Sequence, residues 1–196
     1  ILKYDVFIDW LDTEGRSILF IPIKYGYIDV IQILLDYDDS NIGIFLLNIK
    51  DSYSHLPIHY ALMFKNLKIY QMLIKKTKAS IFDKCNNSLL HLVPKTKDVK
   101  FLLPLFDKNI NIDGTNNLME TALHISCEYD LDDFTTELVK RKCDVNIREK
   151  VNGFPAIFIS LFNGNNNIVN TILGSKQYDI NLTDHNGNTL LHLAIL

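Results

Sequence analysis

One block of sequence recurs six times along this chain at nearly constant spacing. The block "NTLLHLAIL" at 188–196 matches "ETALHISCEYD" at 120–130, "NSLLHLVPKTKD" at 87–98 and "HLPIHYALMFKN" at 55–66, with weaker copies at 16–27 and 154–165. The copies align on the residue three positions before a recurring histidine: Ser17, Leu56, Ser88, Thr121, Pro155 and Thr189. Successive anchors are 39, 32, 33, 34 and 34 residues apart. Such a period is typical of proteins whose stacked units share one core.

Each copy predicts a helix, a turn, a second helix and a protruding loop. In repeat one, Ile28, Ile31, Leu34 and Leu35 recur at spacings that place them on one face of the second helix. Gly26 and Gly164 follow the first helix of their repeats, where a left-handed residue lets the chain reverse. A Ser or Thr at the anchor can cap the first helix. One such unit cannot bury both of its faces, so neighbours must complete its core.

The phased pattern resembles the ankyrin-repeat family. "DHNGNTLLHLA" at 184–194 carries nearly the full opening motif of that family, and "RKCDVNIRE" at 141–149 matches its closing hairpin stretch. The resemblance implies an all-α solenoid of stacked helix-turn-helix units with protruding β-hairpin loops, forming a single array over residues 1–196. The repeats are expected at approximately 12–50, 51–82, 83–115, 116–149, 150–183 and, in part, 184–196, with 1–11 as the tail of a preceding repeat.

Several positions depart from the family pattern. Repeat three is about two residues short, and Pro94 and Pro104 lie in or beside its helices, so short helices or a tight turn are expected there. About six extra residues between repeats one and two, within 36–52, are assigned to the connecting loop. The last copy stops after its first helix, which suggests that repeats or a larger protein continue beyond both ends.

Composition excludes several classes of partner and location. The net charge is −3 and no block of like charge occurs, so no phosphate-neutralising surface and no nucleic-acid partner are expected. No stretch of about 18 apolar residues occurs, so no membrane insertion is expected. Cys85, Cys127 and Cys143 lack CxxC spacing, which favours buried, reduced thiols in a cytoplasmic protein over disulfides.

The recurring histidines are interpreted as structural. His59, His91 and His124 occupy the same repeat position, as does His192, whereas Phe20 and Phe158 replace histidine in the other two copies. A catalytic or metal-binding group would not be exchangeable with phenylalanine, and side chains about 10 Å apart cannot share one metal ion. The ankyrin resemblance implies that this histidine ties neighbouring repeats together through hydrogen bonds.

Other candidate sites give weaker signals. The "DYDD" run at 36–39 lacks the ligand ladder of a calcium loop, and a solvated acidic loop is favoured. His124 and Cys127 are three residues apart on one helix, but a catalytic dyad would need an exposed thiolate. Asn146 matches a hairpin asparagine that is hydroxylated in some ankyrin proteins. No phosphate loop or hydrolase motif occurs, so no enzyme, metal or cofactor is expected.

The resemblance implies that another protein, as a peptide or helical segment, binds the concave face. We define the concave face as the hairpin tips together with the exposed ends of the first, inner helices. Three repeats place an aromatic side chain at one equivalent position on it: Tyr25, Phe64 and Tyr129. Rings of this kind suit binding hot spots, although packing onto neighbouring repeats is the alternative. The candidate partner-binding residues are Arg16, Lys24, Tyr25, Tyr53, His55, Met63, Phe64, Glu120, Glu128, Tyr129, Phe154, Phe162, Asn163, His185 and Asn186.

Two functional hypotheses follow, because a fold of this kind hosts many roles. The first is a scaffold or adaptor that captures a segment of another protein. The alternative is a regulatory block that docks on a flanking domain of its own chain, as in a trafficking exchange factor or an acyltransferase, or that serves a microbial or viral effector directed at a host.

Overall fold

The computed structural model describes residues 10–36, 42–78 and 81–195. The chain divides into two compact units, residues 1–84 and 85–196, and each is considered by itself. The expected helix tail within 1–9 and the Tyr37–Asp39 part of the acidic run lie outside the described residues. Over the described ranges the chain is helical and forms no named strand; its β-pairing there consists of isolated bridges such as Arg148–Pro155 and Thr183–Thr189. The all-α prediction is therefore confirmed.

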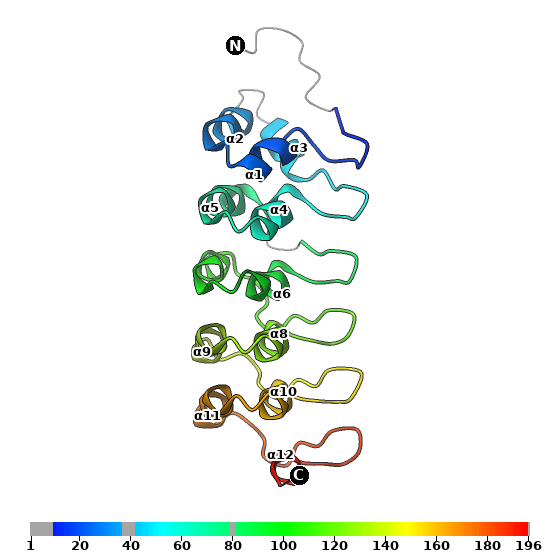
Figure 1. Cartoon of the computed structure of the whole chain (residues 1–196), viewed down its shortest axis with the longest axis vertical. Helices are drawn as coiled ribbons and strands as arrows, with labels where there is room; N and C mark the ends of the chain where they lie inside the picture. Colours follow the sequence, from blue (N-terminus) through cyan, green and yellow to red (C-terminus); the bar gives the residue numbers. More distant parts are fainter. Residues whose placement is uncertain (1–9, 37–41, 79–80, 196) are drawn as a thin grey trace. The chain divides into compact units, whose positions relative to one another are not determined.

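The first unit contains two helix pairs and one additional helix (Figure 1). Its elements are α1 (Phe20–Tyr25), α2 (Ile28–Leu35), α3 (Ile42–Leu47), α4 (Pro57–Met63) and α5 (Leu67–Lys76). In each pair the inner helix, α1 or α4, turns directly into the outer helix, α2 or α5. Of the stripe predicted on α2, Ile31, Leu34 and Leu35 are buried, and Ile28 is half-buried.

The second unit continues the same pattern over four repeats. Its elements are α6 (Leu89–Leu92), η1 (Val93–Thr96), η2 (Val99–Phe101), α7 (Leu103–Phe106), α8 (Ala122–Glu128), α9 (Asp132–Lys140), α10 (Ala156–Phe162), α11 (Asn166–Gly174) and α12 (Leu190–Ala194). Within this unit the inner helices form one row, the outer helices a second row, and the hairpin loops project on one side (Figure 1). Repeat three is broken into short helical pieces, as its two prolines predict.

The turn between inner and outer helix is the same in five repeats. Its central residue has a positive φ in each: 77° at Gly26, 52° at Lys65, 60° at Lys97, 54° at Asp130 and 72° at Gly164. The left-handed region strains any residue with a Cβ. Glycine avoids this strain in repeats one and five. In the other three repeats the backbone remains strained, because the packing of the helix pair requires the chain to reverse at this residue.

The assignment of the extra residues between repeats one and two to a loop is wrong. They contain α3, whose Leu46 and Leu47 are buried in the first unit. A Cβ on Gly43 would lie 2.7 Å from the carbonyl oxygen of Leu35, so only glycine permits this approach of α3 to the end of α2. The apolar run therefore forms the helix α3, which packs on the first unit, and not a connecting loop.

Two smaller expectations also need correction. The first helix of repeat one begins two residues later than its anchor suggests, and its N-cap is Leu19 instead of Ser17. Cys127 and Cys143 are buried as expected, but Cys85 is exposed. The thiols of Cys127 and Cys143 are free.

Candidate protein-interaction surface

The recurring histidines close the start of the inner helices that carry them. The backbone N–H of Thr121 lies 3.1 Å from Nδ1 of His124, and an N–H can only donate, so Nδ1 accepts. The ring proton therefore sits on Nε2, which donates to the carbonyl oxygen of Phe154 in the next repeat at 3.1 Å. His91 makes the same pair of bonds, to Ser88 N–H and to the Glu120 carbonyl. The structural interpretation of these two histidines is confirmed.

The hydroxyl at the anchor forms a capping box with the histidine at Ser88, Thr121 and Thr189. Thr189 Oγ1 accepts the N–H of His192 at 3.5 Å, which is the predicted capping bond. At Ser88, Thr121 and Thr189 the hydroxyl also lies within 2.8, 2.9 and 2.7 Å of the histidine Nδ1. Hydroxyl and ring therefore cap these helices together, and this explains why the histidine follows the anchor at a fixed distance of three residues.

The buried histidines should make stability depend on pH. Burial lowers the pKa of His59 to about 4 and also lowers the pKa of His124. Below the unfolded value of about 6.5 the unfolded chain takes up protons that the folded chain refuses. The free energy of unfolding is therefore expected to fall between pH 7 and pH 5, with a slope from His59 approaching about 1.4 kcal/mol per pH unit and a further contribution of the same sign from His124. Urea titrations at a series of pH values measure this slope.

The matched control uses phenylalanine, which repeats one and five carry at this position. In the double variant His59→Phe and His124→Phe, the slope between pH 7 and pH 5 should shrink markedly, whatever the absolute stability. Carboxylates such as Asp51, whose pKa is lowered by Tyr60 and backbone donors although burial opposes this, act only below about pH 4. An unchanged slope in the variant would show that other groups govern the pH response.

The hairpins hold buried polar side chains in structural roles. Asp51 accepts the N–H groups of Tyr53 and His55, and Glu149 accepts those of Val151 and Asn152. Asp184 does the same for Asn186 and Asn188. These acceptors fold each tip into a tight turn. These hydrogen bonds engage the three carboxylates, so their role is structural and not that of an acid or base.

Asparagine side chains join neighbouring repeats in the second unit. The Asn146 amide accepts from Asp179 N–H and donates to the Gln177 carbonyl, so both of its polar atoms are engaged. Asn165 accepts the Ile168 N–H as the cap of α11 and donates to Asp132. The Asn-rich stretch at 164–170 is therefore explained by capping and by links between repeats four and five.

The chemical candidates find no support in the described part of the chain. Burial raises the pKa of the Cys127 thiol to about 12, so the nucleophilic thiolate is absent at neutral pH. Among the described residues, no group of three His, Cys, Asp or Glu side chains is placed to hold a metal ion. In the same residues no helix is long and apolar enough to cross a membrane.

The concave face of the first unit carries a continuous aromatic cluster. Phe20 lies edge-on to Tyr60 with ring centroids 4.7 Å apart, and Tyr60 stacks on Phe64 at 6.1 Å. The Arg16 guanidinium covers the other side of Phe20, 3.9 Å from its centroid. Phe64 remains 40% exposed, so the cluster presents one ring edge to solvent.

The first unit holds two further ring pairs. Tyr25 stacks on Tyr27 at 5.9 Å, and Tyr53 stacks on His55 at 6.1 Å. Between the two repeats lies a hollow of about 10 Å³, lined by Arg16, Ser17, Phe20, Ile49, Asp51, His55, Pro57 and Tyr60. A cavity needs roughly 10–15 Å³ to hold one water molecule, so this hollow is too small for a cofactor.

The concave face of the second unit is more polar. Tyr129 is 38% exposed between Glu128 and Asp130, which are both exposed. Phe154 contacts Phe162 with centroids 5.4 Å apart, and Phe162 is 57% exposed. In repeat three, Lys95 is exposed and Thr96 is buried, so the aromatic series is interrupted there.

None of the fifteen predicted binding residues is buried. Several of them, however, also hold the fold together. The Asn163 amide donates to the Cys127 carbonyl, His185 donates its backbone N–H to the Asn152 carbonyl, and the Glu120 carboxylate accepts from Asn116. Their value as contacts for a partner stays a prediction.

Sequence reasoning missed two residues of the first unit's concave face. The Tyr60 hydroxyl donates to the buried Asp51 carboxylate and thereby fixes the central ring of the cluster. Lys84 reaches back from the next hairpin to donate to the Ser52 carbonyl, with its ammonium 5.9 Å from the Tyr53 ring. The sequence signal for Lys84 is its position in the repeat. Lys84 directly follows the hairpin carboxylate Asp83, just as Ser52 directly follows Asp51 in the preceding hairpin.

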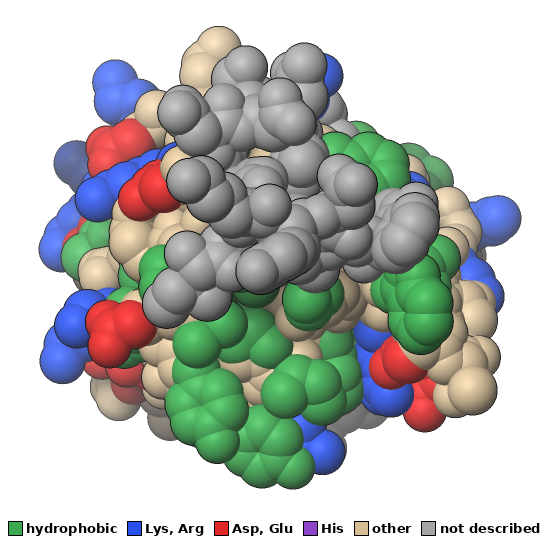
Figure 2. Space-filling model, turned by 90° about the horizontal axis from the view of Figure 1, so that it is seen from above, with side chains coloured by type: hydrophobic (Ala, Val, Ile, Leu, Met, Phe, Trp, Pro, Cys, Tyr) green, Lys and Arg blue, Asp and Glu red, His purple; other side chains and the backbone are tan. Residues whose placement is uncertain are grey.

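A second apolar surface of the first unit lies outside the concave face. Ile21, Val30 and Ile33 are exposed. Figure 2, a view from above, shows hydrophobic side chains gathered on the part that is not drawn in grey. Tyr60, at the position equivalent to Ile21, packs against Phe20 of the preceding repeat. The position of Ile21 is thus one that meets a neighbouring repeat within this unit.

Comparisons with known proteins agree with the geometry. A family model described as ankyrin repeats (3 copies) matches residues 1–85 and 58–149. An ankyrin repeat protein of Acanthamoeba polyphaga mimivirus is 34% identical over 100% of this chain, which spans 26% of that protein. The nuclear factor NF-kappa-B p105 subunit of Gallus gallus is 24% identical over 93% of the chain, which spans 19% of that protein.

The fold also matches a solved structure. The crystal structure of the ankyrin repeat domain of Bcl-3 superposes with a TM-score of 0.81 at 18% identity, covering 92% of this chain and 80% of that one. The present chain spans about a quarter or less of the two curated relatives. Ankyrin repeats are generic protein-interaction modules. With six phased copies, the shared histidine links and a family model that matches most of its length, the chain belongs to the ankyrin-repeat family.

Proposed function

We propose that this chain binds a segment of another protein on its concave face and acts as a scaffold or adaptor, with no catalytic role of its own. The observation that carries the proposal is the exposure of aromatic rings at equivalent repeat positions. Tyr25 is 59% exposed, and Phe64 and Tyr129 are also exposed. Such rings bury a large area at low entropic cost, so they are suited to anchoring a partner.

The polar groups beside these rings support binding over catalysis. Lys24 and Glu128, next to Tyr25 and Tyr129, are exposed and can pair with a partner at the rim of an interface. The thiols of Cys127 and Cys143 are buried. The hairpin carboxylates of Asp51, Glu149 and Asp184 accept hydrogen bonds from backbone N–H groups. We place the protein in the cytoplasm, because the two buried thiols that the structure describes are free.

Replacing Tyr25, Phe64 and Tyr129 with alanine is expected to weaken partner binding at least about 100-fold while leaving the fold intact. The measurement is a pull-down from lysate of the source cell with the 196-residue chain, in which the variant's folding is checked by circular dichroism. The control replaces Lys68, Asp133 and Lys140, exposed residues of the outer helices, with alanine. A folded triple variant that retains the wild-type partners would contradict the proposal.

A regulatory role within a longer chain is the alternative. It is favoured by the length of the relatives, of which this chain covers only a part. In that case the concave face would hold a flanking domain of the same protein, and the pull-down would capture no specific partner. Adding the flanking domain as a separate polypeptide distinguishes the two roles, because it would then bind the wild type and not the triple variant.

A further inference from the structure

Exposed rings on the concave face of the first unit each stand beside a lysine. The Lys24 ammonium lies 5.4 Å from the centroid of the Tyr25 ring, and the Lys84 ammonium lies 5.9 Å from that of Tyr53. Lys65 directly follows Phe64, in the left-handed turn that ends the inner helix. Tyr25, Tyr53 and Phe64 therefore each combine an apolar surface with a nearby positive charge.

The carboxylates of this surface are already engaged. Asp12 and Glu14 both form ion pairs with Arg16, at 2.6 and 2.8 Å. Asp51 is buried, where it accepts from the Tyr60 hydroxyl and from two backbone N–H groups. Within the described residues, no ion pair to a carboxylate is formed by Lys24, Lys65 or Lys84, whose charges stay available to a ligand.

Repeat four, in the second unit, shows the opposite charge at the same repeat positions, whereas repeat three has Lys95 and Lys97 there but no ring. Where repeat two has Phe64 followed by Lys65, repeat four has Tyr129 followed by Asp130, and Glu128 precedes it. Asp130 also accepts from the Asn163 amide. The pairing of ring and lysine is thus a property of the first unit and not a general consequence of the repeat.

We propose that the concave face of the first unit selects a linear peptide segment in which Asp or Glu residues stand next to aromatic or branched apolar residues. This inference rests on the proposed function. An apolar side chain can pack on a ring while the neighbouring carboxylate meets the adjacent ammonium, which gives a charge-assisted hydrogen bond. The spacing of the lysines then sets which peptides are accepted.

The test selects short random peptides displayed on phage against the whole chain. Enriched peptides are synthesised in two forms, one with Asp and Glu and one with Asn and Gln at the same positions. The acidic form is expected to bind at least about tenfold more tightly, and its affinity should fall as salt is raised. The double variant Lys24→Glu and Lys84→Glu should remove this preference.

The control for charge reversal is Lys68→Glu, on the outer helix of the same unit, which should leave binding unchanged. A second control, Tyr25→Ala with Phe64→Ala, should weaken both peptide forms. Peptides that respond to the ring variant but bind equally in both forms would overturn the acidic preference and leave the proposed function standing. Selected peptides that ignore the ring variant, or a selection that yields none, would count against the proposed function itself.

Discussion

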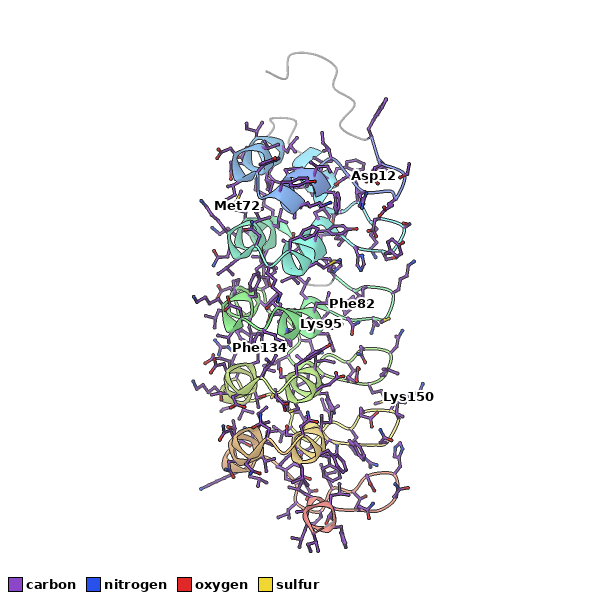
Figure 3. All side chains as sticks on the ribbon, in the orientation of Figure 1. Asp12, Met72, Phe82, Lys95, Phe134 and Lys150 are labelled. Atoms are coloured by element: carbon purple, nitrogen blue, oxygen red, sulfur yellow. The ribbon has the colours of Figure 1, made fainter. Side chains whose placement is uncertain are left out.

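Phe134→Ala is expected to lower the free energy of unfolding by about 3–5 kcal/mol. Phe134 lies on α9 in the interior of the second unit and is 1% exposed (Figure 3). α9 packs against both α8 and α11, so the ring lies between neighbouring repeats and within its own helix pair. Removing the ring leaves a cavity that the rigid helix pairs cannot close. The free-energy cost of this cavity adds to the transfer free energy that is lost with the ring.

Urea denaturation monitored by circular dichroism measures this change. Lys140→Ala, on the same helix, is the control, because its side chain is exposed and its ion pair with Glu137 lies at the surface. That variant should change the free energy of unfolding by less than about 0.5 kcal/mol. A Phe134→Ala variant as stable as Lys140→Ala would show that α9 does not pack in the interior as described.

His124→Ala is expected to cost about 3 kcal/mol. The side chain is buried, and both of its nitrogens are hydrogen-bonded. Alanine would leave the Thr121 N–H and the Phe154 carbonyl without their partner and would also open a cavity. One substitution would thus remove the cap of α8 and the link from repeat four to repeat five.

His192→Ala provides an internal comparison. His192 accepts the N–H of Thr189 in the same way, but it is exposed and, among the described residues, its Nε2 makes no bond to a following repeat. The expected loss is about 1 kcal/mol, the value of a helix cap. Equal losses for His124 and His192 would show that the link between repeats contributes little, so that capping alone explains the motif.

The repeat pattern made most of the fold predictable. A stacked unit imposes the same requirement at the same position each time, so a period near 33 aligns residues by their role. The histidine at three residues after the anchor and the glycine at the turn both followed from this alignment. The short helices of repeat three followed from two prolines whose effect on a helix is local.

The residues that could not be predicted lie where the repeat does not apply. α3 falls between two copies, so alignment with other repeats assigns it no role and leaves it as a loop. Its docking depends on the absence of a side chain at Gly43, where the backbone of Leu35 approaches, and this is a contact across two helices. The pairing of Lys84 with Tyr53 joins successive hairpins, and neither residue alone indicates it.

The most direct test of a binding role for the concave face is site-specific photo-crosslinking. A benzophenone amino acid is placed either at Phe64, on the concave face, or at Lys68, on the outer helix of the same unit. Both positions are exposed, and they are only four residues apart. We predict covalent adducts with the partner from position 64 and none from position 68. Adducts from position 68 alone, or equally from both, would contradict the account.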